Sequence, residues 1–150
     1  MYILLIFLLI AADQAIKFAV RANFEKFESL PVIEGFFHLT YIQNRGAAFG
    51  LLQNRTWIFI VITVAVVGYI LYYITKNKKA DRKLKLILSI IAAGAVGNLI
   101  DRVMLGYVVD MFDFRGIWQF VFNFADICVV LGTLSLLVLV IMDKDILESL

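Results

Sequence analysis

The chain has 150 residues, of which 63% are hydrophobic and 17% charged, and its mean hydropathy is +0.92. This composition is far more apolar than that of soluble domains, and it predicts an integral membrane protein built as one helical bundle. The net charge of +2 is too small to indicate a nucleic-acid-binding protein. The single cysteine, Cys128, excludes an internal disulfide and any cysteine-based metal cluster, and we expect it to pack in its apolar run.

Four apolar stretches, at about 1–20, 57–74, 84–105 and 122–142, are each near the ~20 residues that a membrane-spanning helix needs. The first stretch has no basic segment before it and no small-residue cleavage site after it, so we expect a retained span and not a signal peptide. The predicted fold is therefore mainly α, a four-transmembrane-helix bundle in a single domain over 1–150.

The first span contains Asp13 and Lys17, which are four residues apart and therefore lie on one helical face, where they can pair. A charge inside a membrane span is costly unless it is paired or hydrogen-bonded. The pair is expected either to hold the bundle together or to frame a functional site, and the two roles are compatible.

The connection at 21–56 is too long to be a plain loop. Residues 36–43 have strand-like composition, and the Asn-Arg-Gly sequence at 44–46 indicates a turn. We therefore expect a small sheet, or β-cradle, at the outer membrane interface. The only histidine, His38, is expected to face solvent or the interface. With one histidine in the chain, a histidine-rich metal site or a Ser-His-Asp triad is not expected.

Between the second and third spans, six of the 14 basic residues fall within the ten positions 76–85. The positive-inside rule places this connection in the cytoplasm. With four spans, both termini are then cytoplasmic, and the connections at 21–56 and 106–121 face outward. In that topology, all the unusual polar residues of the spans lie near the outer face.

The end of the third span contains Asn98, Asp101 and Arg102, whose spacing places them on one helical face. They are expected either to join helices or to bind a peptide backbone or lipid carbonyls, and we favour binding for the asparagine and the arginine. Small residues that allow close helix packing come just before them: Ala93, Gly94 and Gly97.

Asp110 and Asp126 are the most informative pair of acids in the chain. The first follows the third span and the second begins the fourth, so the short connection between these spans is expected to bring them together. Two carboxyls in one site share a proton, and such a dyad can activate water with one member and protonate a carbonyl with the other. Two unrelated interface acids remain an alternative, and Asp113 is a rival partner for Asp110.

Five segments match one protein family in its order along the chain: 13–17 (DQAIK), 44–50 (NRGAAFG), 94–102 (GAVGNLIDR), 108–110 (VVD) and 122–126 (FNFAD). On these residues the chain resembles the lipoprotein signal peptidases (signal peptidase II), which are bacterial membrane aspartyl proteases. It departs from the commonest family pattern at Ala93, where glycine is frequent, and at Met111, where phenylalanine is usual.

The resemblance implies an endopeptidase that removes the signal peptide from diacylglyceryl-modified prolipoproteins, cutting just before the lipidated cysteine, without a metal or cofactor. It implies that Asp110 and Asp126 are the catalytic dyad and that Asp101 orients Arg102. Other residues are implied to line or order the substrate site, or to support it as a polar network: Asn44, Gly46, Asn98, Arg102, Asn123, Asp13 and Lys17.

The resemblance also implies a monomer in the inner or plasma membrane of a bacterium, with prolipoproteins, membrane lipids and globomycin-type inhibitors as partners and no nucleic acid. Its outer parts are expected to be a cradle at 21–56 and a second, mobile element within 106–121 that clamps the substrate. The active site is expected to face the extracytoplasmic side.

Two other classes of protein remain as alternatives from the residues themselves. A transporter or proton-conducting subunit also carries intramembrane charges, but it needs them through the whole bilayer depth, and the second span and the inner half of the fourth have none. A scaffold protein would use the same polar residues only to join helices. In that case Asp110→Asn would impair folding, and there would be no reaction for it to impair.

Overall fold

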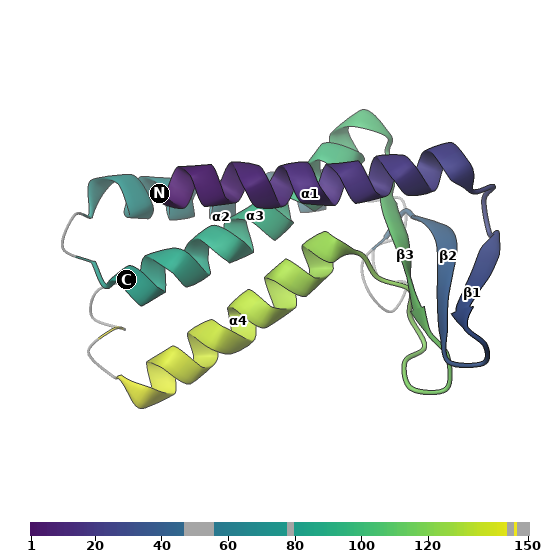
Figure 1. The fold of residues 1–150 in the computed structure, drawn as a ribbon. Helices are drawn as coiled ribbons and strands as arrows, with labels where there is room; N and C mark the ends of the chain where they lie inside the picture. The colour runs from purple at the N-terminus through teal and green to yellow at the C-terminus, as the bar shows by residue number, and fades with distance from the viewer. Residues whose placement is uncertain (47–55, 78–79, 144–145, 147–150) are drawn as a thin grey trace.

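The computed structural model describes residues 1–46, 56–77, 80–143 and 146 (Figure 1). Four helices within these ranges are long and apolar enough to cross a membrane, which confirms the predicted spans to within three residues at either end. The helices are α1 (Tyr2–Asn23), α2 (Thr56–Lys76), α3 (Arg82–Met104) and α4 (Phe124–Met142), and the strands are β1 (Ser29–Ile33), β2 (Phe37–Asn44) and β3 (Val108–Phe114).

Helix α3 is the interior helix of the bundle, because it packs against α1, α2 and α4. Within its most apolar stretch 56% is buried, against 17% for α4, whose apolar surface is left for lipid to cover. Small residues bring α3 and α4 together: a Cβ atom on Gly94 would collide with the carbonyl oxygen of Ala125, and one on Gly132 would lie 2.6 Å from the Ile91 side chain. The expected packing role of Gly94 is confirmed, and buried Cys128 lies in the same contact.

The three strands form one antiparallel sheet in the order β1-β2-β3, at the opposite end of the bundle from the start of α1 (Figure 1). The predicted strand at 36–43 is β2, and the sheet confirms the expected cradle. The strands on either side of it, β1 and β3, were not predicted. Aromatic side chains hold one part of this sheet together, since Phe37 stacks on Phe114 with ring centres 4.6 Å apart, and Phe122 packs on Phe112 and Phe114.

The expectation that His38 faces solvent or the interface is wrong, because its side chain is only 6% exposed. The reason is that β2 is the central strand, so that strand neighbours flank His38 on both sides: Pro31 of β1 and Asp113 of β3. The hydroxyl of Ser29 lies 3.4 Å from its Nδ1 atom.

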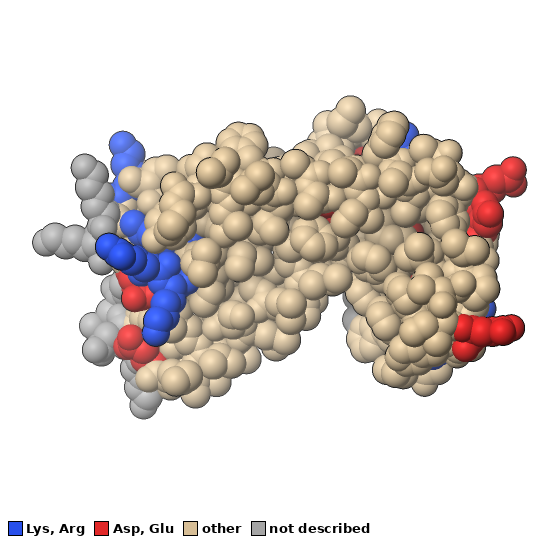
Figure 2. Space-filling model, viewed as in Figure 1, with Lys and Arg blue, Asp and Glu red and all other residues tan. Residues whose placement is uncertain are grey.

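Charge is concentrated at the two ends of the molecule (Figure 2). Lys and Arg side chains gather at the end where α3 begins, acidic side chains appear at both ends, and the wide band between the ends is almost free of charge on the face shown. The same view shows a hollow between the first part of α4 and the sheet. An uncharged band between two polar ends is the surface expected of a membrane-spanning bundle.

Candidate active site

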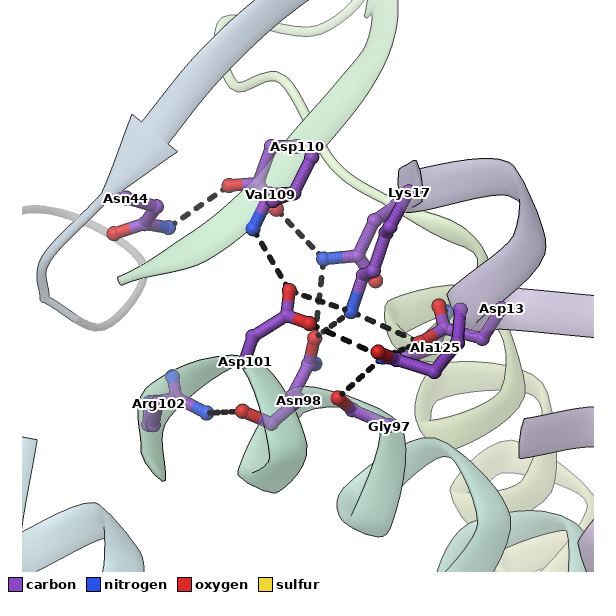
Figure 3. Close-up of polar contacts among 12 residues, drawn as sticks. Asp13, Lys17, Asn44, Gly97, Asn98, Asp101, Arg102, Val109, Asp110 and Ala125 are labelled. Carbon is purple, nitrogen blue, oxygen red and sulfur yellow. Dashed lines mark hydrogen bonds and ion pairs between the residues drawn. The ribbon is translucent and has the colours of Figure 1, made fainter. Parts of the chain in front are cut away.

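Polar side chains from four separate elements converge where the sheet meets the bundle, and Figure 3 shows three of them: Asn44, Asn98 and Asp110. Asp110 comes from β3, Asn44 from the end of β2, Asn98 from α3, and Asp126 from the first turn of α4. Asn123, the residue before α4, completes the group and is fully buried. The structure thus brings together the two acids that the sequence paired, and three of the five residues in this group are buried: Asp110, Asn98 and Asn123.

The backbone fixes the approach of Asp110 to Asp126. The amides of Met111 and Phe112 both donate to the carbonyl oxygen of Phe122, at 3.0 and 2.8 Å, and the Phe122 amide donates back to Phe112 at 3.1 Å. These bonds tie the strand that carries Asp110 to the segment that starts α4. Within 106–121, residues 108–114 are thus the edge strand β3.

Asp126 belongs to the N-terminal cap of α4. The Asn123 side chain accepts a hydrogen bond from the Asp126 amide at 2.9 Å, and the Asp126 carboxyl accepts one from the Asn123 amide at 3.2 Å, a reciprocal capping box. The other Asp126 oxygen accepts a bond of 2.8 Å from the side-chain amide of Asn98.

Asp110 lies in a less favourable environment for a charge. Its carboxyl accepts hydrogen bonds from Asn123 at 2.6 Å and from Asn44 at 3.0 Å, but it is only 2% exposed. Burial, together with the negative charge of Asp126, raises the pKa of Asp110 to about 7, against a usual value of 3.8. The pair therefore contains an acid that holds a proton near neutral pH, with a second carboxyl beside it.

Asp113, the rival partner, does not join this pair. It lies three residues beyond Asp110 on the same strand, a spacing that places the two side chains on opposite faces of the sheet. Its carboxyl instead accepts hydrogen bonds from Thr40 at 2.8 Å and from Arg115 at 3.1 Å. Of the two candidate partners for Asp110, the structure selects Asp126.

A buried ion cluster lies beside Asp110 and Asp126. The Lys17 ammonium contacts Asp13 at 3.0 Å, Asp101 at 3.1 Å and the side-chain oxygen of Asn98 at 2.9 Å, and these charged side chains are at most 2% exposed. The predicted pairing of Asp13 with Lys17 is confirmed. The unexpected member is Asp101, which shares the same lysine.

The contacts of Asp101 among the described residues are with Lys17, Gln14 and the Val109 amide, so the predicted orientation of Arg102 by Asp101 has no direct contact to support it. Consecutive residues of a helix point about 100° apart, so one side chain faces the ion cluster and the other does not. The Arg102 guanidinium donates to the backbone oxygen of Asn98 at 3.5 Å and lies 5.0 Å from the ring centre of Phe59 on α2. It is partly exposed at the edge of the site, and its charge acts on both dyad carboxyls.

Some functional positions were missed by the sequence analysis or have a role that it did not foresee. The side-chain amide of Gln14 lies 3.1 Å from Asp13, from Asp101 and from the backbone oxygen of Gly97, although the sequence analysis gave this residue of the matching segment 13–17 no role of its own. The Gly46 amide donates to the side-chain oxygen of Asn44 at 3.0 Å and so helps to position it. Residues 47–50 of the same matching segment lie outside the described residues.

The site can thus polarise a carbonyl with one carboxyl and deprotonate water with the other, which is the chemistry of acid–base peptide hydrolysis. Within the described residues, no group of three histidine, cysteine, aspartate or glutamate side chains is arranged to hold a metal ion. The three buried acids and the half-buried Asp126 are bound instead by Lys17 and by N–H donors.

Residues 5–142 match the family model described as signal peptidase (SPase) II. The chain is 51% identical over 142 residues to a lipoprotein signal peptidase of Clostridioides difficile, covering 94% of this chain and 95% of the relative. It is 47% identical over 138 residues to one of Fusobacterium nucleatum, covering 91% and 84%. A solved structure described as a bacterial membrane enzyme, determined by the in meso method at 2.3 Å resolution, superposes with a TM-score of 0.88 at 30% identity, covering 95% of this chain and 88% of the other.

Proposed function

The chain belongs to the signal peptidase II family of aspartic-type proteases, which cleave signal peptides from prolipoproteins, and on that premise we propose that Asp110 and Asp126 are its catalytic dyad. The observation that supports this assignment most strongly is that both carboxyls, from separate elements, accept hydrogen bonds from the same buried residue: Asp110 from the side-chain amide of Asn123, and Asp126 from its backbone amide. Such a shared partner holds the two acids in one site with a defined separation.

In the proposed mechanism, the ionised Asp126 takes a proton from a water molecule as that water attacks the scissile carbonyl carbon. Asp110 gives its proton to the carbonyl oxygen, and a neutral tetrahedral intermediate forms. Collapse of the intermediate breaks the C–N bond, returns the hydroxyl proton to Asp110, and passes the proton on Asp126 to the leaving amine. The asparagine amides that bond both carboxyls keep them in place through these transfers.

The proposed substrate bond lies just before the diacylglyceryl-modified cysteine. The end of a signal-peptide helix would reach the site through the hollow between α4 and the sheet, and the acyl chains would stay in lipid beside the bundle (Figure 2). Arg102 at the edge of the site has five donors, of which one is used among the contacts of the described residues, and it would bind a peptide carbonyl. Residues 115–121, which follow β3, remain the candidate for the mobile element that closes over the substrate.

We further propose that the connection at 76–85 and both termini are cytoplasmic, and that the dyad faces the extracytoplasmic side. The gathering of basic side chains at the end away from the sheet supports this orientation (Figure 2). In a Cys128→Ala background, a membrane-impermeant maleimide should label Lys26→Cys in intact cells, and Lys83→Cys only after the membrane is opened. The reverse labelling pattern would contradict the orientation.

The proposed function is tested by cleavage of a diacylglyceryl-modified prolipoprotein by the purified protein. Wild type should cut directly before the lipidated cysteine, and Asp110→Asn and Asp126→Asn, compared at equal folded amounts, should be slower by at least ~100-fold because acid–base catalysis is lost. Asp113→Asn is the matched control and should remain active. Normal cleavage by either dyad variant would reject the assignment of that residue, and a cut elsewhere would reject the proposed bond. A globomycin-type peptide should inhibit the wild type by occupying the dyad.

A further inference from the structure

Two acids outside the dyad, Asp13 and Asp101, each accept a hydrogen bond from the backbone amide of a residue that directly precedes a dyad aspartate (Figure 3). The Asp101 carboxyl accepts a hydrogen bond of 2.9 Å from the amide of Val109. The Asp13 carboxyl accepts one of 3.0 Å from the amide of Ala125. Each amide belongs to the residue directly before a dyad aspartate, and both of these residues are completely buried.

One lysine joins the two acids. The Lys17 ammonium lies 3.0 Å from Asp13 and 3.1 Å from Asp101, which come from different helices, α1 and α3. Gln14 contacts both carboxyls as well, at 3.1 Å. The distance between the Asp13 and Asp101 carboxyls is therefore set by their common cation, Lys17. That distance in turn sets the distance between the two backbone amides that these carboxyls bind.

The same lysine also acts on the dyad through a side chain. An ammonium group only donates hydrogen bonds, so the 2.9 Å contact requires that the oxygen of the Asn98 amide faces Lys17. The nitrogen of that amide must then face Asp126, to which it donates at 2.8 Å. Lys17 thus fixes which end of Asn98 meets the dyad.

An ion cluster that only joined helices would need none of these bonds. The Asp13–Lys17–Asp101 contacts alone connect α1 to α3, whereas the two amide bonds reach β3 and the first turn of α4, which are the elements that carry the dyad. A buried amide must find an acceptor, and here each acceptor is an acid of the same cluster.

We propose that Asp13, Lys17 and Asp101 form an amide clamp, a set of positioning residues that fixes the separation of the two dyad carboxyls by holding the backbone amides of Val109 and Ala125. The inference rests on the proposed assignment of the dyad. The clamp contacts neither the substrate nor the reacting atoms. Its effect is therefore expected on the rate of the chemical step, kcat, because small misplacements of reacting groups cost much in rate.

Asp101 provides the sharpest test, because two substitutions there separate the amide bond from the charge. Asp101→Asn keeps an oxygen that can accept from Val109, and Asp101→Ala removes it. We expect Asp101→Ala to lower kcat by about 100-fold with KM changed by less than about threefold, and Asp101→Asn to recover at least about tenfold of that loss. Steady-state kinetics on the diacylglyceryl-modified prolipoprotein, with folded enzyme counted, gives both constants.

Two variants serve as controls in the same assay. Asp81→Ala removes a helix cap at the far end of α3 and should lower thermal stability while kcat stays unchanged. Asp110→Asn tests the proposed function itself: if it cleaves normally, the dyad assignment fails independently of the clamp. If it is inactive and the Asp101 variants behave as expected, both the dyad and the clamp stand.

Three results would overturn the clamp. The first is a folded Asp101→Ala enzyme with the kcat of wild type. The second is a change confined to KM, which would make Asp101 a substrate contact. The third is an equal loss in Asp101→Asn and Asp101→Ala, which would make the charge, and not the amide bond, the cause. If Asp101→Ala does not fold, replacing the Val109 amide by an ester removes the same bond from the other side: a lowered kcat then supports the clamp, and an unchanged kcat rejects it.

Discussion

The two ends of the bundle use the same residue types in opposite environments. At the end where α3 begins, Asp81 is exposed, and its side chain caps the helix by accepting from the amides of Lys83 and Leu84 at 2.7 and 2.9 Å. At the sheet end, Asp110 is 2% exposed. Bonds from backbone amides, that of Leu84 above all, lower the pKa of Asp81 below its usual value, whereas burial raises that of Asp110 to about 7.

The difference shows how one protein separates stability from chemistry. For an exposed acid at a helix start, the ionised form is favourable, and such an acid adds modestly to stability. For a buried acid beside another acid, the ionised form is unfavourable, so its pKa is raised and it keeps a proton that it can donate near neutral pH. Substitutions of the same kind at the two ends should therefore have unequal consequences.

Removing a lysine from each end should give the largest contrast. Lys17→Met leaves the buried carboxylates of Asp13 and Asp101 without their cation, and breaking a buried ion pair in this way costs about 3–5 kcal/mol. Lys83→Met removes an exposed charge at the other end and should change stability by less than about 0.5 kcal/mol. Thermal unfolding in detergent measures both, and equal losses would refute the difference between the two ends.

The pH dependence of stability should also have opposite signs at the two ends. The folded state binds the Asp110 proton more tightly than the unfolded chain does, so this group stabilises the fold below its usual pKa of 3.8, and the contribution is lost as pH rises towards about 7. The slope approaches about 1.4 kcal/mol per pH unit. The lowered pKa of Asp81 gives the reverse: its stabilisation is present above 3.8 and is lost as the pH falls through the lowered value.

Comparing wild type with Asp110→Asn isolates this contribution. The variant should lack the fall in unfolding temperature between about pH 4 and pH 7, while Asp81→Asn should leave that fall in place. Cleavage by wild type should decline as pH rises through about 7, where the dyad loses its shared proton. A flat activity profile from acid to neutral pH and beyond would argue against a dyad that carries one proton.

The sequence predicts the parts of this comparison that depend on composition and spacing. The four spans, the basic end at 76–85, the Asp13–Lys17 pair and the convergence of Asp110 with Asp126 all follow from hydropathy, charge and chain connectivity. The capping box at Asn123 was also readable, since asparagine followed three residues later by an acid at the start of an apolar run is a helix-start pattern.

The rest depended on tertiary contacts that leave no local trace. Strand β3 pairs with β2 across about half of the chain, from Asn44 with Val108 to Phe37 with Phe114, and nothing in its own sequence indicates this partner. The partner of Asp101 in β3 is a backbone amide, which every residue except proline possesses, so no residue type marks it. Gln14 was overlooked for a similar reason: its three acceptors come from two helices that only the fold brings together.

Two glycines offer a smaller contrast that does not change any charge. A Cβ atom on Gly97 would lie 2.5 Å from the Asp13 carboxyl and 3.2 Å from the Ala125 side chain, so Gly97→Ala must displace the amide clamp. Overpacking of this kind costs about 1–3 kcal/mol. Gly68 on α2 has open space around it, so Gly68→Ala should be neutral or stabilising by up to about 1 kcal/mol. Unfolding temperatures that fall equally for both variants would show that the space beside Asp13 is not tight.

The smallest effect is expected at the exposed end, and it tests whether that end has a purely structural role. Asp81→Ala removes the acceptor for two amides at the start of α3 and should cost about 1 kcal/mol, the usual value of a helix N-cap. Asp81→Asn retains a capping oxygen and should recover most of that loss. Because α3 also carries Asn98 and Asp101 near its other end, a change in kcat with Asp81→Ala would mean that motion at the helix start reaches the dyad. An unchanged kcat with a lowered unfolding temperature would show that the interior helix transmits no such motion, and that only contacts at the sheet end set the geometry of the site.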